Sequence, residues 1–263
     1  MTVPLAETFD VAGPDGAPAV VLVHGTRLTR TMWSAQLHGL SADLRVIAVD
    51  LPGHGALRDE RFTLDSAAAQ VAQVIEAAAG GRAVVVGLSL GGYVAMHLAA
   101  ARPELVRGLV LSGSSAEPVG WRSLPYRGLA WALDHLGDRR LDPINAWFFR
   151  TRYPAPIAEP IVAGGFWYHG GAAALRALVG QSFVARLAAY DGPTLFLNGT
   201  YDLPFRLSAR TFARAARRPR RVRLAGATHL ANLDRPAAFD AAVRRFVQSL
   251  DEAATTGLPV PRW

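Results

Sequence analysis

Short apolar runs rich in β-branched residues alternate along this chain with longer stretches whose apolar residues recur at helical spacing. Such alternation is typical of βαβ units, and strands that are apolar throughout are typical of a sheet covered by helices on both faces. The pattern therefore predicts an α/β fold with a mainly parallel central sheet and helices on both faces. The expected strands span residues 19–23, 45–49, 83–87, 108–111, 194–197 and 221–224, and the expected helices span 31–40, 63–79, 90–101, 206–216 and 236–250.

Two segments depart from this alternation. Before residue 19, the turn sequence Gly13-Pro14-Asp15-Gly16 indicates one or two antiparallel strands, which makes the strand at 108–111 as late as the sixth. Residues 112–191 are rich in Pro, Gly and aromatic side chains and favour several short helices. We expect them to form a helical cap, inserted after the sixth strand into a core made of residues 1–111 and 192–263. An insertion at this point lies over the carboxyl ends of the strands, where ligands bind.

The composition excludes several kinds of chemistry. All 28 basic residues of this 263-residue chain are Arg, so no lysine is available for a Schiff base, including one to pyridoxal phosphate. Cys is absent, which excludes thiolate nucleophiles, disulfides and cysteine-ligated metals. The net charge of +7 accompanies many Ala, Gly and Pro residues and fits a GC-rich coding sequence. The densest basic stretch, 206–223, fits a solvated outer face, so we expect no nucleic-acid partner.

Two segments of the sequence bear on the cellular location. The first residues, Met1 to Glu7, lack the basic and apolar regions of a secretory signal. The uncharged run at 83–101 approaches the length of a membrane span, but three glycines and His97 interrupt it. The sequence therefore favours a soluble, cytoplasmic protein that acts on a small molecule and has no membrane partner. It leaves the oligomeric state open.

The strongest chemical signal is the hexapeptide Gly87-Leu88-Ser89-Leu90-Gly91-Gly92, which follows an expected strand and begins an expected helix. A serine nucleophile needs its hydroxyl raised above the sheet, and a strained strand-to-helix turn achieves this when glycines stand two residues before and after the serine. The alternative is a glycine-rich connection with an incidental serine. The context of strand, turn and helix favours Ser89 as a nucleophile.

Two further polar residues follow the ends of later strands. Asp202 comes after Leu197-Asn198-Gly199-Thr200-Tyr201, and His229 comes after Ala225-Gly226-Ala227-Thr228. Taken singly, each fits a turn or a loop. Together with Ser89 they supply a nucleophile, a base and a carboxylate that would hold the histidine's tautomer and stabilise its imidazolium.

From about residue 19 to 250 the chain resembles the α/β-hydrolases, in which the triad follows the order Ser, Asp, His. Asp50-Leu51-Pro52-Gly53-His54-Gly55 and Trp33 are similar to further family motifs, and we interpret Asp50 and His54 as structural. The resemblance implies that the backbone N–H groups of Thr26, after His24-Gly25, and of Leu90 form the oxyanion hole. His24 itself is expected to shape the loop by hydrogen bonding.

Short motifs around Ser89 and His229 are similar to those of enol-lactonases and small carboxylesterases. Ser at position 89 disfavours relatives that use Asp as nucleophile, and Thr26-Arg27-Leu28 lacks the Gly-Pro-Gly of relatives that cleave carbon–carbon bonds. We therefore predict hydrolysis of a carboxylic ester or lactone of a small apolar or aromatic substrate, with no cofactor and no metal. A carbon–carbon hydrolase, a perhydrolase or other serine-dependent biosynthetic step, and a non-catalytic ligand-binding protein stay open as alternatives.

The cap is expected to supply the substrate pocket, because aromatic rings offer large contact areas. Trp147, Phe148 and Trp167 are the aromatic candidates for substrate binding, although most cap aromatics are expected to pack the cap onto the core. Arg27, beside the expected oxyanion hole, is the candidate for holding a substrate carboxylate, with surface solvation as the alternative.

Overall fold

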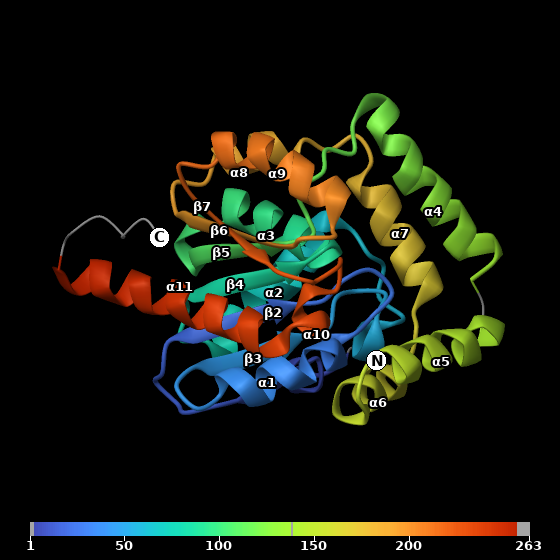
Figure 1. Cartoon of the computed structure of the whole chain (residues 1–263), viewed down its shortest axis with the longest axis horizontal. Helices are drawn as coiled ribbons and strands as arrows, with labels where there is room; N and C mark the ends of the chain where they lie inside the picture. Colours follow the sequence, from blue (N-terminus) through green and yellow to red (C-terminus); the bar gives the residue numbers. More distant parts are fainter. Residues whose placement is uncertain (1–2, 138, 257–263) are drawn as a thin grey trace.

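The computed structural model describes residues 3–137 and 139–256, and its centre is a seven-stranded sheet (Figure 1). The strand order is β1-β3-β2-β4-β5-β6-β7; β1 runs antiparallel to β3, and every other neighbouring pair is parallel. The strands are β1 (Phe9–Ala12), β2 (Ala19–Val23), β3 (Arg45–Val49), β4 (Ala83–Leu88), β5 (Val106–Ser112), β6 (Pro193–Gly199) and β7 (Arg218–Leu224). Every residue of β2, β4 and β6 is buried, which explains why these runs are apolar or nearly so throughout.

The segment before Ala19 forms one strand, β1, rather than two. The expectation that the helical insertion follows the sixth strand is therefore wrong by one: it follows the fifth, β5. The turn at 13–16 joins β1 to β2, which are not neighbours in the sheet, because β3 lies between them.

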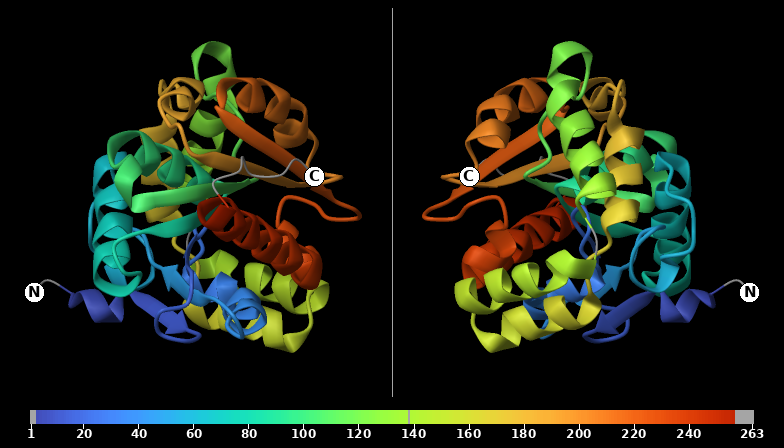
Figure 2. Two further views of the ribbon diagram at one scale, coloured as in Figure 1. Left: turned by 90° about the vertical axis from the view of Figure 1, so that its left-hand side faces the viewer. Right: turned by 90° about the vertical axis from the view of Figure 1, so that its right-hand side faces the viewer.

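Helices cover both faces of the sheet (Figure 2). One apolar core includes α2 (Leu64–Ala78), α3 (Leu90–Ala101) and α8 (Phe183–Ala188), and the other includes α1 (Ser34–Leu40) and α11 (Pro236–Thr256). Thr63 caps α2, since its hydroxyl oxygen accepts the Ser66 N–H at 2.9 Å and the Ser66 hydroxyl oxygen accepts the Thr63 N–H at 2.9 Å. The core helices are α1 (Ser34–Leu40), α2 (Leu64–Ala78), α3 (Leu90–Ala101), α9 (Leu203–Ala215), α10 (Ala231–Asp234) and α11 (Pro236–Thr256).

Of the helices between β5 and β6, all but the last lie beyond one end of the sheet, on the right of Figure 1, and the last packs against α3 and α9 over the sheet. They are α4 (Leu124–His135), α5 (Asp142–Arg152), α6 (Ala155–Gly164), α7 (Tyr168–Leu178) and α8 (Phe183–Ala188). Helix α4 packs against α7, and α5 packs against α6. These helices fall within residues 112–191, the segment that the sequence assigns to the cap.

The strand order reverses direction between β2 and β4. From β2 the chain crosses to β3 on one side, returns past β2 to β4, and then adds β5, β6 and β7 on the other side. The crevice outside the carboxyl ends of the strands at such a reversal is the usual ligand site of an open α/β sheet. Thr26 follows β2 and Ser89 follows β4, so both predicted site segments lie at this crevice.

Candidate active site

Ser89 occupies a strained turn between β4 and α3. Its φ of 52° lies in the left-handed region that residues with a Cβ rarely adopt. A Cβ on Gly87 would lie 2.4 Å from the Gly91 carbonyl, and a Cβ on Gly91 would lie 2.1 Å from the Val23 carbonyl oxygen. Glycine is therefore required at both positions for this turn to pack against its neighbours, as the sequence indicated.

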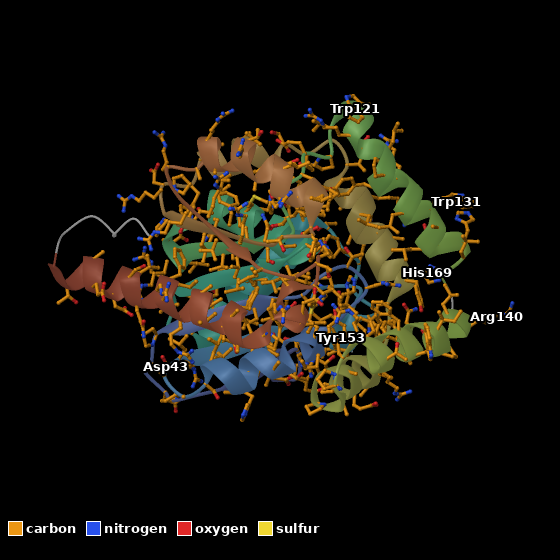
Figure 3. The ribbon with its side chains drawn as sticks, in the orientation of Figure 1. Asp43, Trp121, Trp131, Arg140, Tyr153 and His169 are labelled. Atoms are coloured by element: carbon orange, nitrogen blue, oxygen red, sulfur yellow. The ribbon has the colours of Figure 1, made fainter. Side chains whose placement is uncertain are left out.

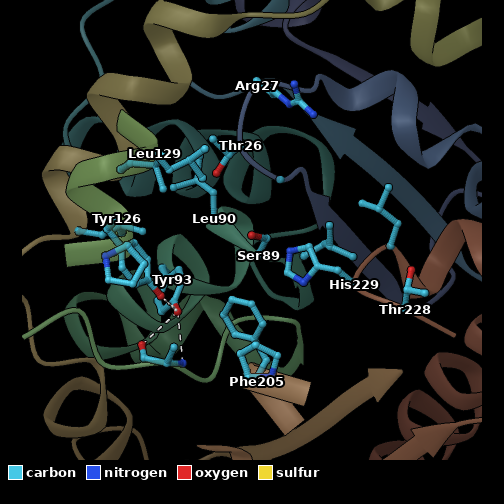
Figure 4. Close-up of a pocket in the computed structure, with 18 of the residues that line it drawn as sticks. Thr26, Arg27, Ser89, Leu90, Tyr93, Tyr126, Leu129, Phe205, Thr228 and His229 are labelled. Atoms are coloured by element: carbon cyan, nitrogen blue, oxygen red, sulfur yellow. Dashed lines mark hydrogen bonds between the residues drawn. The ribbon is translucent and has the colours of Figure 1, made fainter. Parts of the chain in front are cut away.

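Asp202 and His229 form a hydrogen-bonded pair beside this turn. His229 Nδ1 lies 3.1 Å from Asp202 Oδ2 and 3.3 Å from Oδ1, and Asp202 is only 5% exposed. Because an ionised carboxylate only accepts hydrogen bonds, Nδ1 is the protonated nitrogen and Nε2 carries the free lone pair. Ser89 and His229 line one cavity, and Figure 4 shows the Ser89 hydroxyl beside the His229 ring. The structure thus brings the three predicted residues together.

Two residues that the sequence did not single out fix the His229 ring. The ring of Phe205, in α9, lies 4.9 Å from the imidazole between centroids. Gly113, directly after β5, has a φ of 57°, and a Cβ there would lie 2.7 Å from His229 Cε1. The Gly113 N–H donates to Asn198 Oδ1 at 2.9 Å. No sequence motif marks either residue, because their contacts depend on the adjacency of β5, β6 and the loop after β7.

The backbone N–H groups of Thr26 and Leu90 are available to a ligand. Leu90 is the first residue of α3, so its N–H has no acceptor within the helix. Among the residues that the structure describes, neither N–H donates to a protein acceptor. Both residues line the cavity that holds Ser89, so the geometry is compatible with an oxyanion hole.

Two buried histidines support the loop that carries Thr26. The His24 Nδ1–H donates to the Gly25 carbonyl at 2.9 Å, and Nε2 accepts the Leu51 N–H at 3.0 Å. The His54 Nδ1–H donates to the Pro52 carbonyl at 3.0 Å, and Nε2 accepts the Arg27 N–H at 3.3 Å. Burial lowers the pKa of His24 to about 4 and that of His54 to about 3. The structural role predicted for both histidines is therefore confirmed.

Asp50 completes this support. Its buried carboxylate accepts the Arg30 N–H and the Ala56 N–H at 2.8 and 2.9 Å and pairs with the Arg30 guanidinium. A Cβ on Gly55 would lie 2.2 Å from one of its oxygens. Asp50 therefore ties the segment after β3 to η2 (Arg30–Trp33), which follows the Thr26 loop.

The cavity above Ser89 has a volume of about 1140 Å³ and is lined mainly by apolar side chains from α4, α5, α7 and α9. Phe148 lines it, as the sequence predicted. Trp147 and Trp167 do not: Trp147 is 66% exposed on the outside of α5, and the Trp167 indole N–H donates to the Gly164 carbonyl at 3.0 Å. Figure 3 shows Trp131 projecting outward from α4, whereas Tyr153 lies inside the molecule. Trp121 is exposed as well, but it lines the cavity.

Arg27 lies at the edge of this cavity, but its guanidinium points away from Ser89 (Figure 4). The guanidinium donates to Asn145 Oδ1, in α5, at 3.1 Å. Burial lowers its pKa below the usual value for arginine. The backbone N–H of Trp167 also donates to the Arg27 carbonyl at 2.9 Å. In this structure Arg27 therefore joins the Thr26 loop to the cap.

No metal site is evident among residues 3–137 and 139–256, where no three His, Asp or Glu side chains are grouped to hold an ion. None of the helices in that part of the chain is long and apolar enough to span a membrane.

The family model for the alpha/beta hydrolase family matches residues 20–242, which is most of the chain. The chain belongs to the α/β-hydrolase family. This α/β-hydrolase is 41% identical over 118 residues to a pimeloyl-acyl-carrier protein methyl ester esterase of Neisseria meningitidis, an alignment that covers 44% of each protein. The first curated relatives are thus matched over less than half of their length.

Two other similarities extend over nearly the whole chain. The α/β-hydrolase is 25% identical to 3-oxoadipate enol-lactonase 1 of Acinetobacter baylyi, across 92% of this chain and 93% of that protein. The solved structure of a thermophilic esterase from Thermogutta terrifontis, with malate bound, superposes with a TM-score of 0.76 at 26% identity. That superposition covers 92% of this chain and 93% of the other.

Proposed function

We propose that this α/β-hydrolase is a serine esterase or lactonase that cleaves the ester of a small apolar or aromatic substrate through an acyl-enzyme. The single observation that carries the proposal is the convergence at one apolar cavity of a strained Ser89, a His229 paired with a buried Asp202, and two free backbone N–H groups. Relatives named as esterases and as an enol-lactonase support an ester or lactone as the substrate.

The proposed reaction proceeds in two halves. His229 Nε2 accepts the Ser89 hydroxyl proton while Oγ attacks the carbonyl carbon, and the N–H groups of Thr26 and Leu90 stabilise the oxyanion. The His229 imidazolium then donates that proton to the leaving alkoxide, which leaves an acyl-Ser89 ester. Water, deprotonated by His229, attacks the acyl carbon, and Ser89 regains its proton as the acid departs. Asp202 stays ionised and holds the histidine in the tautomer that the first step requires.

The cavity indicates the kind of acyl or alcohol group that fits. Its wall near Ser89 includes Leu90, Tyr93, Tyr126 and Phe205, which offer apolar surface with few hydrogen-bonding groups. The hydroxyls of Tyr93 and Tyr126 bond to each other at 2.7 Å. Burial raises the pKa of both hydroxyls, so they remain neutral. An apolar group that binds beside them therefore does not have to displace water from a charge.

Three further statements stay predictions of the sequence. They are the division into a core of residues 1–111 and 192–263 with a cap of residues 112–191, a cytoplasmic location, and the absence of nucleic-acid and membrane partners. Residues 257–263 of the predicted core lie outside the described residues.

Hydrolysis of p-nitrophenyl esters of increasing acyl length tests the proposal. We expect Ser89→Ala to lower kcat on the order of 10⁴-fold or more, whereas Ser41→Ala, at a serine outside the cavity, keeps the rate of the wild type. The acyl length with the highest kcat/KM then measures how much of the cavity the acyl group fills. A folded wild-type protein that hydrolyses none of these esters and is not labelled by a fluorophosphonate contradicts the proposal.

A further inference from the structure

Asp234, the last residue of α10, holds a buried carboxylate with four hydrogen-bond donors from two parts of the chain. Its side chain is 1% exposed. Oδ2 accepts the backbone N–H and the hydroxyl of Thr228, each at 2.6 Å. Oδ1 accepts Arg152 Nη2 at 2.8 Å and the Tyr153 hydroxyl at 3.0 Å. Buried carboxylates are costly unless every lone pair is used, and here each oxygen has two donors.

The first pair of donors belongs to the loop of the predicted base. Thr228 directly precedes His229, and both residues line the cavity. Of the hydrogen bonds that fix this loop, the two from Thr228 are the shortest that reach a charged group. Because the backbone N–H of Thr228 is held, rotation of the peptide unit between Ala227 and Thr228, which directly precedes the peptide unit between Thr228 and His229, is restricted. Asp202 fixes the tautomer of the ring, and Asp234 fixes the backbone from which the ring projects.

The second pair of donors belongs to the cap. Arg152 is the last residue of α5 and Tyr153 follows it, and both line the same cavity together with Phe149. Burial, together with the neighbouring negative charge of Asp234, raises the pKa of Tyr153, so its hydroxyl stays a donor. A second arginine of α5, Arg150, forms an ion pair with Glu159 of α6 that is about half exposed and lies outside the cavity. Among the described residues, Arg150 and Glu159 form hydrogen bonds with each other and none with the His229 loop, so this pair offers a matched control.

We infer that Asp234 is a positioning residue that ties the His229 loop to the end of α5, so that the reactivity of Ser89 depends on a contact between the cap and the core. The inference rests on the proposed function, because it assigns His229 as the base. The carboxyl end of α5 then has two roles: it helps to align the base through Asp234, and it forms part of the cavity wall.

The direct test measures phosphorylation of Ser89 by diethyl p-nitrophenyl phosphate, because this small reagent reports on the serine and its base without filling the cavity. Asp234→Asn leaves the Thr228 N–H facing an amide, and we expect the phosphorylation rate and kcat for a p-nitrophenyl ester to fall about 10- to 100-fold. KM is expected to change less than about threefold, because the carboxylate faces the loop and the cap rather than the ester. Glu159→Gln is expected to retain the wild-type rates.

A second pair of variants separates positioning from folding. Thr228→Val removes one of the two bonds to Oδ2 at nearly constant volume, and Thr228→Ser keeps it. We expect the valine variant to be slower in phosphorylation and the serine variant to recover the wild-type rate, with both melting within a few degrees of the wild type. Tyr153→Phe tests the cap side and is expected to lower kcat while the Thr228 bonds remain.

The outcomes distinguish the two proposals. If wild-type protein is not phosphorylated, the proposed serine chemistry is wrong and this inference falls with it. A second outcome is that the wild-type protein is phosphorylated and that Asp234→Asn and Thr228→Val, both folded, are phosphorylated as fast as the wild type. The positioning role of Asp234 is then wrong while the proposed function stands. Equal losses in Asp234→Asn and Glu159→Gln also overturn the inference, since a general loosening of α5 then explains them.

Discussion

The two buried histidines beside the Thr26 loop make the stability of this protein sensitive to mild acid. Their pKa values in the folded state are about 4 for His24 and about 3 for His54, against 6.5 in an unfolded chain. At pH 5 the unfolded chain therefore binds almost one proton at each histidine, and the folded chain binds almost none. Linkage then gives a loss of about 2 kcal/mol of unfolding free energy per histidine between pH 8 and pH 5, or about 4 kcal/mol for the pair.

The sign follows from the direction of both shifts. A histidine whose folded-state pKa is lowered stabilises the protein above pH 6.5, and this contribution is lost as the pH falls toward the folded-state value. The magnitude at pH 5 depends little on the folded-state values, because both lie well below 5. It is set by the distance from pH 5 to the unfolded value of 6.5.

Urea unfolding at pH 8 and pH 5, followed by circular dichroism, measures this loss. In His54→Gln the side-chain oxygen can still accept the Arg27 N–H, and we expect the decrease in unfolding free energy between the two pH values to be about 2 kcal/mol smaller than in the wild type. His38→Gln, at an exposed histidine, is expected to leave the decrease unchanged. A decrease in His54→Gln as large as that of the wild type would refute the assignment of the acid sensitivity to this site.

Two more predictions concern stability. Burial raises the pKa of Asp240 from 3.8 to about 6, so the folded state disfavours its charge above pH 6. We therefore expect Asp240→Asn to increase the unfolding free energy by about 3 kcal/mol at pH 8 and to leave it unchanged at pH 3.5. An equal effect at both pH values argues against this cause. Gly91→Ala places a methyl group 2.1 Å from the Val23 carbonyl oxygen and is expected to cost more than about 3 kcal/mol in urea unfolding. Gly128→Ala, where nothing lies within 4 Å on α4, is expected to stabilise by about 0.5–1 kcal/mol; similar values for the two alanines would be inconsistent with the steric argument.

The parts of the site that the sequence predicts are those whose cause is local. The turn at Ser89 needs glycines two residues away on each side, so a stretch of five residues is enough to recognise it. The strands β2, β4 and β6 are buried on both faces, and burial of that kind leaves a continuous apolar run. His229 and Asp202 were found because each follows a strand, and parallel strands end at the same edge of the sheet.

The parts that the sequence does not predict depend on which elements become neighbours. Gly113 meets His229 because β5 pairs with β6 and β6 pairs with β7, and no spacing in the chain encodes that contact. In the cap, adjacent residues of α5 take opposite roles: Trp147 faces solvent and Phe148 lines the cavity. Aromatic residues stand on both faces of this helix, so the sequence pattern alone does not show which face is buried.

His54 also connects the stability of the protein to its chemistry. Its Nε2 accepts the N–H of Arg27, the residue that follows Thr26, and this contact helps to hold Arg27 at a φ of 59°. A protonated His54 has no lone pair on Nε2 and would turn a second donor toward that N–H. Protonation of His54 in the folded chain would therefore remove an acceptor from the loop that presents the Thr26 N–H. One N–H of the proposed oxyanion hole thus lies on a loop whose backbone an acid-sensitive histidine holds, because a loop in a strained backbone conformation needs buried acceptors to hold it.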